Sequence, residues 1–231
     1  MEKSLNWREF IITRLIQTSG YSAIVFVALI FFFLLREGIP TLGEVKLSNL
    51  LSARWYPIEN YFGILPLITG SLVVTIGAML IAFPLGIGTA VYISEIAPRW
   101  MREILKPLVE LLGGLPSVVL GFLGILLVSP FLRVFLDLPT GLTAFTGSLL
   151  LGGIAVPTIV SVAEDALDAV PRSYREGAWA LGATRWQTIW RVTLPAAKSG
   201  VLTAVMLGVG RAIGETMTVM MVTGNAPVLA I

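Results

Sequence analysis

The chain has 231 residues, of which 56% are hydrophobic and 13% are charged, a charged fraction about half that of an average soluble protein. With a mean hydropathy of +0.87, this composition excludes an ordinary water-soluble domain and indicates an integral membrane protein. The sequence holds no cysteine and no histidine, and its formal net charge is only +2. These features exclude disulfides and thiol or imidazole chemistry, and they give no reason to expect nucleic-acid binding.

Five apolar stretches are long enough to cross a bilayer, which takes about 20 residues. In chain order we expect spans over residues 19–35, 64–93, 108–128, 142–163 and 200–222. All are rich in small residues that allow close helix packing, and Pro84, Pro116 and Pro157 are expected to kink three of them. The predicted fold class is an all-α integral membrane protein.

The positions of the basic residues predict the orientation of these spans. Eleven Lys and Arg residues lie in the N-terminal segment and in the loops after the second and fourth spans, against four on the opposite side. The positive-inside rule therefore places the N-terminus in the cytoplasm. We expect a cytoplasmic amphipathic segment at 1–18, with an inward extension of the first helix as an equal alternative. We further expect the first span and an external loop at 19–63, and a sixth span beyond Ile231.

The cytoplasmic loop at 171–200 is polar but has clear helix signals. Ser173 with Glu176, and Thr184 with Gln187, have the spacing of two capping boxes. Gly182 stands where a left-handed cap would end the first helix, and the second helix should end before Pro195. Helices this short are not stable alone, so the loop should pack on its own membrane helices and on a partner protein.

The same loop carries a resemblance to the coupling motif of ABC importer permeases, in which Gly177 and Val192 are mild departures from the family's Ala and Ile. The residues that carry it are Glu176, Gly177, Ala178, Gly182, Val192, Leu194 and Pro195. The resemblance implies a helical bundle of the type I importer kind, and a loop that docks on a separate ATPase subunit. The chain contains no phosphate-cradling G-x-x-x-x-G-K-[ST] motif, in keeping with ATP hydrolysis on another chain. An ordinary amphipathic hairpin at the membrane surface is the alternative.

Arg211 and Glu215 are charges within the fifth predicted span, four residues apart and hence on one helix face. A charge at this depth costs at least about 2.5 kcal/mol and should not face lipid. The two side chains pair with each other for packing, or line a path for an anionic substrate, or do both. Arginine offers a planar fork of donors that suits tetrahedral oxyanions.

Two segments resemble the phosphate-specific permeases, and more closely their PstC-like member. They are the string from Arg211 to Met217 with Gly224-Asn225, and the string from Gly114 to Phe122. By this resemblance Arg211 and Glu215 are candidates for phosphate passage, while Pro116 and Ser117 shape the facing helix. As a hypothesis, an ionised Glu215 favours hydrogen phosphate over sulfate, because hydrogen phosphate can donate a hydrogen bond.

The resemblance implies one transmembrane subunit of an ATP-driven phosphate importer in a bacterial or archaeal cytoplasmic (inner) membrane. Its implied partners are a second, distinct permease forming a heterodimer, a cytoplasmic ATP-binding dimer and an extracytoplasmic phosphate-binding protein. No cofactor or metal is expected. The alternatives are a permease for sulfate, molybdate or tungstate, and, from another class, a membrane enzyme or channel. Glu164, Asp165 and Asp168 cluster at the end of the fourth span, and we interpret them as a solvated helix end.

Overall fold

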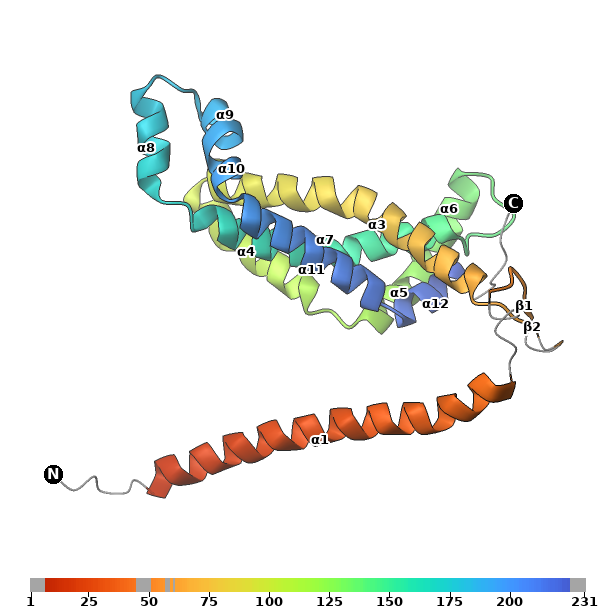
Figure 1. Cartoon of the computed structure of the whole chain (residues 1–231). Coiled ribbons are helices and arrows are strands. Elements are labelled where there is room, and N and C mark those ends of the chain that lie inside the picture. Colours follow the sequence, from red (N-terminus) through yellow and green to blue (C-terminus); the bar gives the residue numbers. More distant parts are fainter. Residues whose placement is uncertain (1–6, 45–50, 57–58, 60, 225–231) are drawn as a thin grey trace. The chain divides into compact units, whose positions relative to one another are not determined.

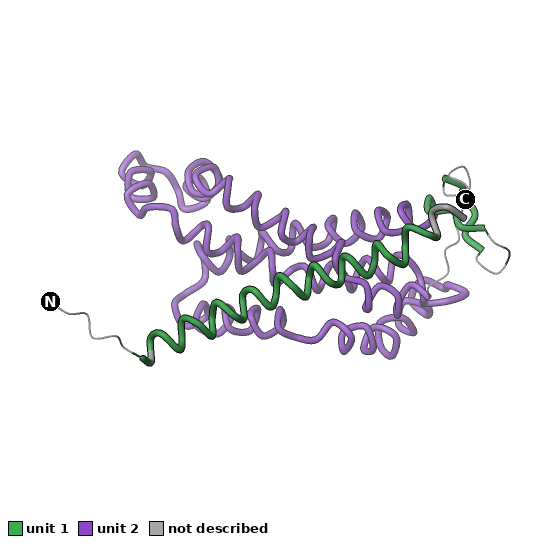
Figure 2. Tube along the Cα trace, turned by 60° about the horizontal axis from the view of Figure 1, so that its bottom comes forward, with its two compact units in different colours: residues 1–65 green, residues 66–231 purple. Residues whose placement is uncertain are grey.

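The computed structural model describes residues 7–44, 51–56, 59 and 61–224, and these are almost entirely helical. The chain divides into two compact units, Met1–Leu65 and Pro66–Ile231, which Figure 2 shows in two colours. Each unit is described by itself.

The first unit consists of one long helix and a small hairpin. Helix α1 (Trp7–Glu44) runs without a break, and its stretch Glu9–Pro40 is apolar and long enough to cross a membrane. Within the described residues, therefore, no helix boundary separates residues 7–18 from the first span. Strands β1 (Trp55–Tyr56) and β2 (Tyr61–Phe62) pair antiparallel, and the rings of Trp55 and Phe62 meet edge to face at 6.3 Å.

The second unit is a helical bundle (Figure 1). In chain order it contains α3 (Leu65–Val91), π-helix η2 (Tyr92–Ile96), α4 (Arg99–Gly113), α5 (Ser117–Leu123), π-helix η3 (Gly124–Val128), α6 (Ser129–Phe135), α7 (Ala144–Asp168), α8 (Arg172–Ala180), α9 (Arg185–Thr188), π-helix η4 (Ile189–Thr193), α10 (Leu194–Ala196), α11 (Lys198–Gly214) and α12 (Met217–Thr223).

Helix α7 forms the centre of this bundle, because α4, α11 and α12 pack against it and α3 contacts it through closely approaching residues. Ile159 of α7 is fully buried and fits between two glycines of neighbouring helices. A Cβ added at Gly86 of α3 would lie 2.7 Å from Ile159 Cγ2, and one at Gly208 of α11 would lie 2.5 Å from Ile159 Cγ1. These glycines thus allow three helices to approach closely. Ser148 Oγ of α7 also donates a hydrogen bond to the Val74 carbonyl of α3 at 3.2 Å, which joins these two helices at a second point.

Among the described residues, four single helices are long and apolar enough to span a membrane, and a bent pair makes a possible fifth. The single helices are Glu9–Pro40, Leu65–Ile96, Ser117–Phe135 and Ala144–Asp168, and the pair is Arg185–Ala196 with Lys198–Gly214, which meet at 74°. The all-α membrane fold predicted from the sequence is confirmed.

Two predicted spans have the wrong boundaries. The stretch 108–128 straddles a break at Gly114–Pro116, so its first part belongs to the separate amphipathic helix α4. Pro116 has extended backbone at the N-cap of α5, and a proline there ends one helix and permits the next to start. The stretch 200–222 is also broken, because α11 ends at Gly214 and Glu215 is extended. Pro84 and Pro157, by contrast, lie inside continuous helices.

Candidate functional site

The loop at 171–200 forms a helical hairpin at one end of the second unit, where Figure 1 shows α8 and α9 side by side. Helix α8 ends at Ala180, and the chain turns at Gly182, whose φ of +82° is in the left-handed region that glycine adopts without strain. The predicted glycine cap is therefore confirmed. Thr184 begins the return helix with a complete capping box to Gln187, through N–H···O contacts of 2.9 and 3.3 Å.

Two predictions about this loop are wrong. Ser173 and Glu176 form no capping box, because α8 begins at Arg172 after Pro171 and has no side-chain cap. Proline presets a helix-compatible backbone without needing a hydroxyl partner. The second helix also does not end before Pro195. Helical backbone continues through η4 into α10, because Pro195 falls in the first turn of α10, where its missing N–H costs nothing.

The hairpin presents apolar side chains to its surroundings. Five large ones are exposed: Tyr174, Trp179, Leu181, Trp186 and Trp190. Leu181, at the tip, is 90% exposed, and Trp186 and Trp190 contact each other edge to face at 5.6 Å. A hollow of about 300 Å³ between the two arms is lined by Ala178, Leu181, Gly182, Ala183, Gln187, Arg191 and Val192. An exposed apolar patch of this kind is typical of a protein-binding surface.

The motif residues divide between the inside and the outside of the hairpin. Ala178 is buried and Leu194 is half-buried, so both hold the hairpin together. Glu176, Gly177, Gly182 and Pro195 are exposed. The exposed members are thus accessible to a partner protein.

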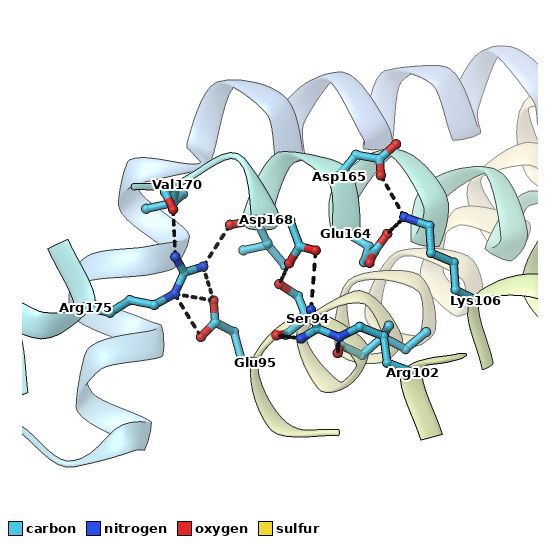
Figure 3. A network of polar contacts seen from close by, with 11 residues as sticks. Ser94, Glu95, Arg102, Lys106, Glu164, Asp165, Asp168, Val170 and Arg175 are labelled. Atoms are coloured by element: carbon cyan, nitrogen blue, oxygen red, sulfur yellow. Dashed lines mark hydrogen bonds and ion pairs between the residues drawn. The ribbon is translucent and has the colours of Figure 1, made fainter. Parts of the chain in front are cut away.

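Arg175 attaches this hairpin to the rest of the bundle (Figure 3). Its Nε donates to both carboxylate oxygens of Glu95 in η2, at 3.0 and 3.3 Å, and its Nη2 donates to Glu95 Oε1 at 2.6 Å. Nη1 donates to the Val170 carbonyl (2.7 Å) and Nη2 to the Leu167 carbonyl (2.9 Å). These carbonyls lie at the C-terminus of α7, where helices leave acceptors unsatisfied and cations are favoured.

A second polar cluster joins α4, η2 and α7. Arg102 of α4 donates through Nε to the Ile93 carbonyl (2.9 Å) and through Nη2 to the Ser94 carbonyl. Its Nη1 lies 3.5 Å from Asp168 Oδ2, and Asp168 Oδ1 accepts from Ser94 Oγ at 2.5 Å. These contacts fasten α4, η2 and α7 together near the C-terminus of α7.

Lys106 of α4 pairs with two carboxylates of α7. Its Nζ lies 2.6 Å from Glu164 Oε2 and 3.0 Å from Asp165 Oδ1. The hydrogen bond to Glu164, more than that to Asp165, raises the pKa of Lys106 above its ordinary range, although burial opposes the rise. Because the Glu164 side chain is only 3% exposed, its interpretation as part of a solvated helix end is wrong.

The predicted membrane residues lie at the break between α11 and α12. Arg211 is exposed in the last turn of α11, and Glu215 is half-buried in the extended link. Glu215 Oε1 accepts from the Thr218 backbone N–H at 3.2 Å, so it caps the first turn of α12. Thr218 Oγ1 in turn donates to the Ser117 carbonyl at 2.8 Å. The structure thus brings Glu215 and Ser117 to one place, on either side of Thr218.

Arg211 and Glu215 do not share a helix face, so that prediction is wrong. The helix stops between them, and the ion pairs of the described residues do not include one joining them. Pro116, at the start of α5, is exposed beside Ser117. Asn225, which contributed to the resemblance, lies outside the described residues.

The residues that the sequence interpretation missed include Thr218, Glu95 and Arg175. Thr218 lies in an apolar run and gives no local signal, yet it is fully buried and bonded to α5. Glu95 and Arg175 are 80 residues apart, and no spacing rule joins side chains at that distance. A hint existed for Glu95, a lone acid at the end of an apolar run.

Comparison with known families identifies the chain. Residues 82–231 match the model of the binding-protein-dependent transport system inner membrane component. The chain belongs to this family. It therefore has the helical fold of an importer permease.

Individual relatives agree with this family. The chain is 47% identical over 189 residues to the probable ABC transporter permease protein YqgH of Bacillus subtilis, which covers 81% of this chain and 61% of YqgH. It is 36% identical over 198 residues to the phosphate transport system permease protein PstC of Xylella fastidiosa (78% and 61% covered). It is 37% identical over 214 residues to PstC 1 of Mycobacterium bovis (84% and 62% covered).

The chain matches about three fifths of the length of these relatives. Among solved structures, a chain of the inward-facing MetNI methionine ABC transporter matches with a TM-score of 0.52 and 24% identity, over 66% of this chain and 68% of that one. This likeness concerns the fold.

Proposed function

We propose that the chain is a transmembrane subunit of an ATP-driven importer of inorganic phosphate in a bacterial or archaeal cytoplasmic (inner) membrane, with its N-terminus in the cytoplasm. The observation that carries the proposal is the hairpin at 171–200, which has the predicted motif and exposes an apolar face. Relatives that are named as phosphate permeases support the substrate. The distribution of Lys and Arg supports the orientation.

The hairpin docks on a separate ATP-binding subunit in this proposal. Its arms are short, with nine residues in α8 and twelve from α9 to α10. Leu181, Trp186 and Trp190 would lose their exposure to water in such a complex. Aromatic side chains in this setting are typical anchors of protein interfaces. The remaining partners are a second permease subunit, which completes the transport path, and an extracytoplasmic phosphate-binding protein.

Phosphate passes the break between α11 and α12 in this proposal. Arg211 is exposed there and offers a cationic fork of donors to an oxyanion. Pro116 and Ser117 shape the facing helix α5, and the backbones come close, since a Cβ at Gly121 would lie 3.1 Å from Thr218 Cα. Glu215 keeps one oxygen on Thr218, while its other oxygen has no hydrogen bond within the described residues and is available to a protonated phosphate oxygen.

The docking proposal is tested with two tryptophans of similar exposure. Trp186 on the hairpin is 60% exposed and Trp100 on α4 is 63% exposed. Trp186→Ala should weaken binding of the purified ATPase subunit by roughly 2 kcal/mol, or about 30-fold, while Trp100→Ala should leave it unchanged. Equal effects of the two substitutions on the Kd would contradict docking at the hairpin.

The path proposal is tested by labelled phosphate uptake into vesicles that contain the complete complex. Arg211→Ala removes a charged hydrogen bond of about 1.5–3 kcal/mol, so the uptake rate should fall roughly tenfold or more. Arg133→Ala, which removes another exposed arginine, is the control and should transport normally. Uptake that Arg211→Ala leaves unaffected would give this arginine a purely structural role.

Glu215→Gln tests the basis of selectivity. Glutamine can still accept the Thr218 N–H with its one oxygen, so the break should keep its geometry. It then presents an NH2 donor where Glu215 presents its second oxygen, so hydrogen phosphate loses its acceptor. We expect competition by sulfate to become stronger. A variant with unchanged preference for phosphate over sulfate shows that the carboxylate does not discriminate.

A further inference from the structure

Helix α8, the first arm of the coupling hairpin, is joined to the membrane bundle largely through one side chain, whereas the return arm reaches the apolar core through Ile189. Within α8 only Ala178 is buried and only Arg175 is half-buried, while the other seven residues are exposed. Helix α8 packs mainly on its own hairpin, against α9 and η4. The apolar core therefore contributes little to fixing the angle between α8 and the spans.

All three nitrogens of the Arg175 guanidinium join α8 to the ends of the spans. The guanidinium contacts Glu95, at the end of the α3 span, and two carbonyls at the end of α7. The Arg175 side chain is 14% exposed and that of Glu95 is 9% exposed, so the pair is shielded from water and salt far more than a surface pair. A bidentate fork between a planar guanidinium and a carboxylate also fixes orientation.

The partners of Arg175 are themselves held rigidly. Glu95 follows Ser94, whose hydroxyl and carbonyl are bound by Asp168 and Arg102. Lys106 joins α4 to Glu164 and Asp165 one turn before Asp168. Figure 3 shows these contacts as three neighbouring groups between α8 and α4, which are joined to one another through the backbones of η2, α4 and α7. A force applied to α8 would thus be transmitted to the ends of α3, α4 and α7 together.

We propose that Arg175, through Glu95 and the carbonyls of Leu167 and Val170, is the positioning residue that makes α8, the first arm of the coupling hairpin, move together with the cytoplasmic ends of α3 and α7. This inference rests on the proposed docking of an ATPase at the hairpin. Without the clamp, the links at Ala169–Pro171 and Gly182 let α8 turn independently of the spans. ATP hydrolysis then continues while less of its motion reaches the transport path.

A distance measurement tests the clamp without reference to any substrate. The chain has no cysteine, so spin labels at Arg172→Cys on α8 and Arg99→Cys on α4, both exposed, report one distance in the assembled complex. We expect Arg175→Ala and Glu95→Gln to broaden this distance distribution, and Arg133→Ala to leave it unchanged. A distribution as narrow in both clamp variants as in the unsubstituted chain would overturn the proposal.

The ratio of phosphate transported to ATP hydrolysed tests its consequence. Coupling between sites commonly changes affinities about 5- to 150-fold, and we expect the ratio to fall roughly fivefold or more in Arg175→Ala, with the ATPase still bound. Arg175→Lys keeps the charge but not the fork, so it should restore part of the ratio. Transport and hydrolysis that fall in equal proportion would overturn the coupling role.

The two measurements keep the inference and the proposed function apart. If the unsubstituted complex transports no phosphate, the substrate proposal fails, while the label distances still decide whether Arg175 holds α8. If Arg175→Ala does not assemble, Glu95→Gln, which keeps an acceptor for the guanidinium, gives both readouts.

Discussion

Single side chains decide how the two halves of the candidate path meet. Thr218 is fully buried, and its hydroxyl donates a hydrogen bond from α12 to the Ser117 carbonyl of α5. Neither residue is charged, and the bond joins positions 101 residues apart. The spacing of residues in the sequence therefore could not predict this hydrogen bond. The role of Glu215 at the site, by contrast, was predicted from the motif that begins at Arg211.

Replacement of Thr218 by valine tests this link. Thr218→Val keeps the shape but leaves the Ser117 carbonyl without its hydroxyl donor, so unfolding in detergent should become easier by about 1–3 kcal/mol. Thr203→Val is the control, because Thr203 is exposed and bonds only within its own helix, to Ser199. Equal shifts of the thermal midpoint in both variants would show that the α5–α12 bond adds nothing.

Lys106 gives a second prediction at this scale, including its pH dependence. Its pKa is raised, first by the hydrogen bond to Glu164. The pair therefore stabilises the fold fully below the ordinary lysine pKa of 10.5 and loses this effect only as the pH rises beyond that value. Lys106→Met should lower the thermal midpoint at neutral pH, since it leaves the buried Glu164 without its cation.

The control for Lys106 is an exposed pair. The Arg99 and Glu103 side chains are 95% and 69% exposed, and such pairs are worth about 0–1 kcal/mol. Arg99→Met should therefore change the midpoint little. The thermal midpoints of the unsubstituted chain and of Lys106→Met should differ at neutral pH. If they are already equal there, the pairing of Lys106 with Glu164 does not stabilise the fold.

Elements were predictable where length and composition determine them. The spans at Leu65–Ile96 and Ala144–Asp168 follow from uninterrupted apolar runs, and the turn at Gly182 follows from its position between two helix patterns. The break at Glu215 was not predictable, because no proline marks it. It is stabilised instead by tertiary contacts of the next helix, through Thr218 and Gly121.

Close approach of α7 and α11 gives a prediction at the element scale. Gly208→Ala places a Cβ 2.5 Å from Ile159 Cγ1, and Ile159 cannot withdraw because Gly86 lies against its other side. Overpacking of this kind costs about 1–3 kcal/mol, which should appear as a lower thermal midpoint. Gly210→Ala, on the same helix with open space around its Cβ, should be neutral or slightly stabilising. A lower thermal midpoint for Gly210→Ala than for Gly208→Ala would contradict this packing.

At the scale of the whole molecule, the chain spans about 61% of the length of YqgH and of the Xylella PstC, and its hairpin exposes an apolar face. The membership of a transporter family was already visible in the spacing from Glu176 to Pro195. The contact between Arg175 and Glu95, which joins the hairpin to the spans, could not be predicted from the sequence, because it depends on how three distant segments pack.

The measurement that tests the central proposal most directly is the initial rate of labelled phosphate uptake by the complete complex in vesicles, with and without ATP, under excess sulfate and molybdate. The proposal predicts uptake that requires ATP and resists both competitors. Uptake that proceeds equally without ATP, or that either competitor abolishes, would contradict an ATP-driven phosphate importer.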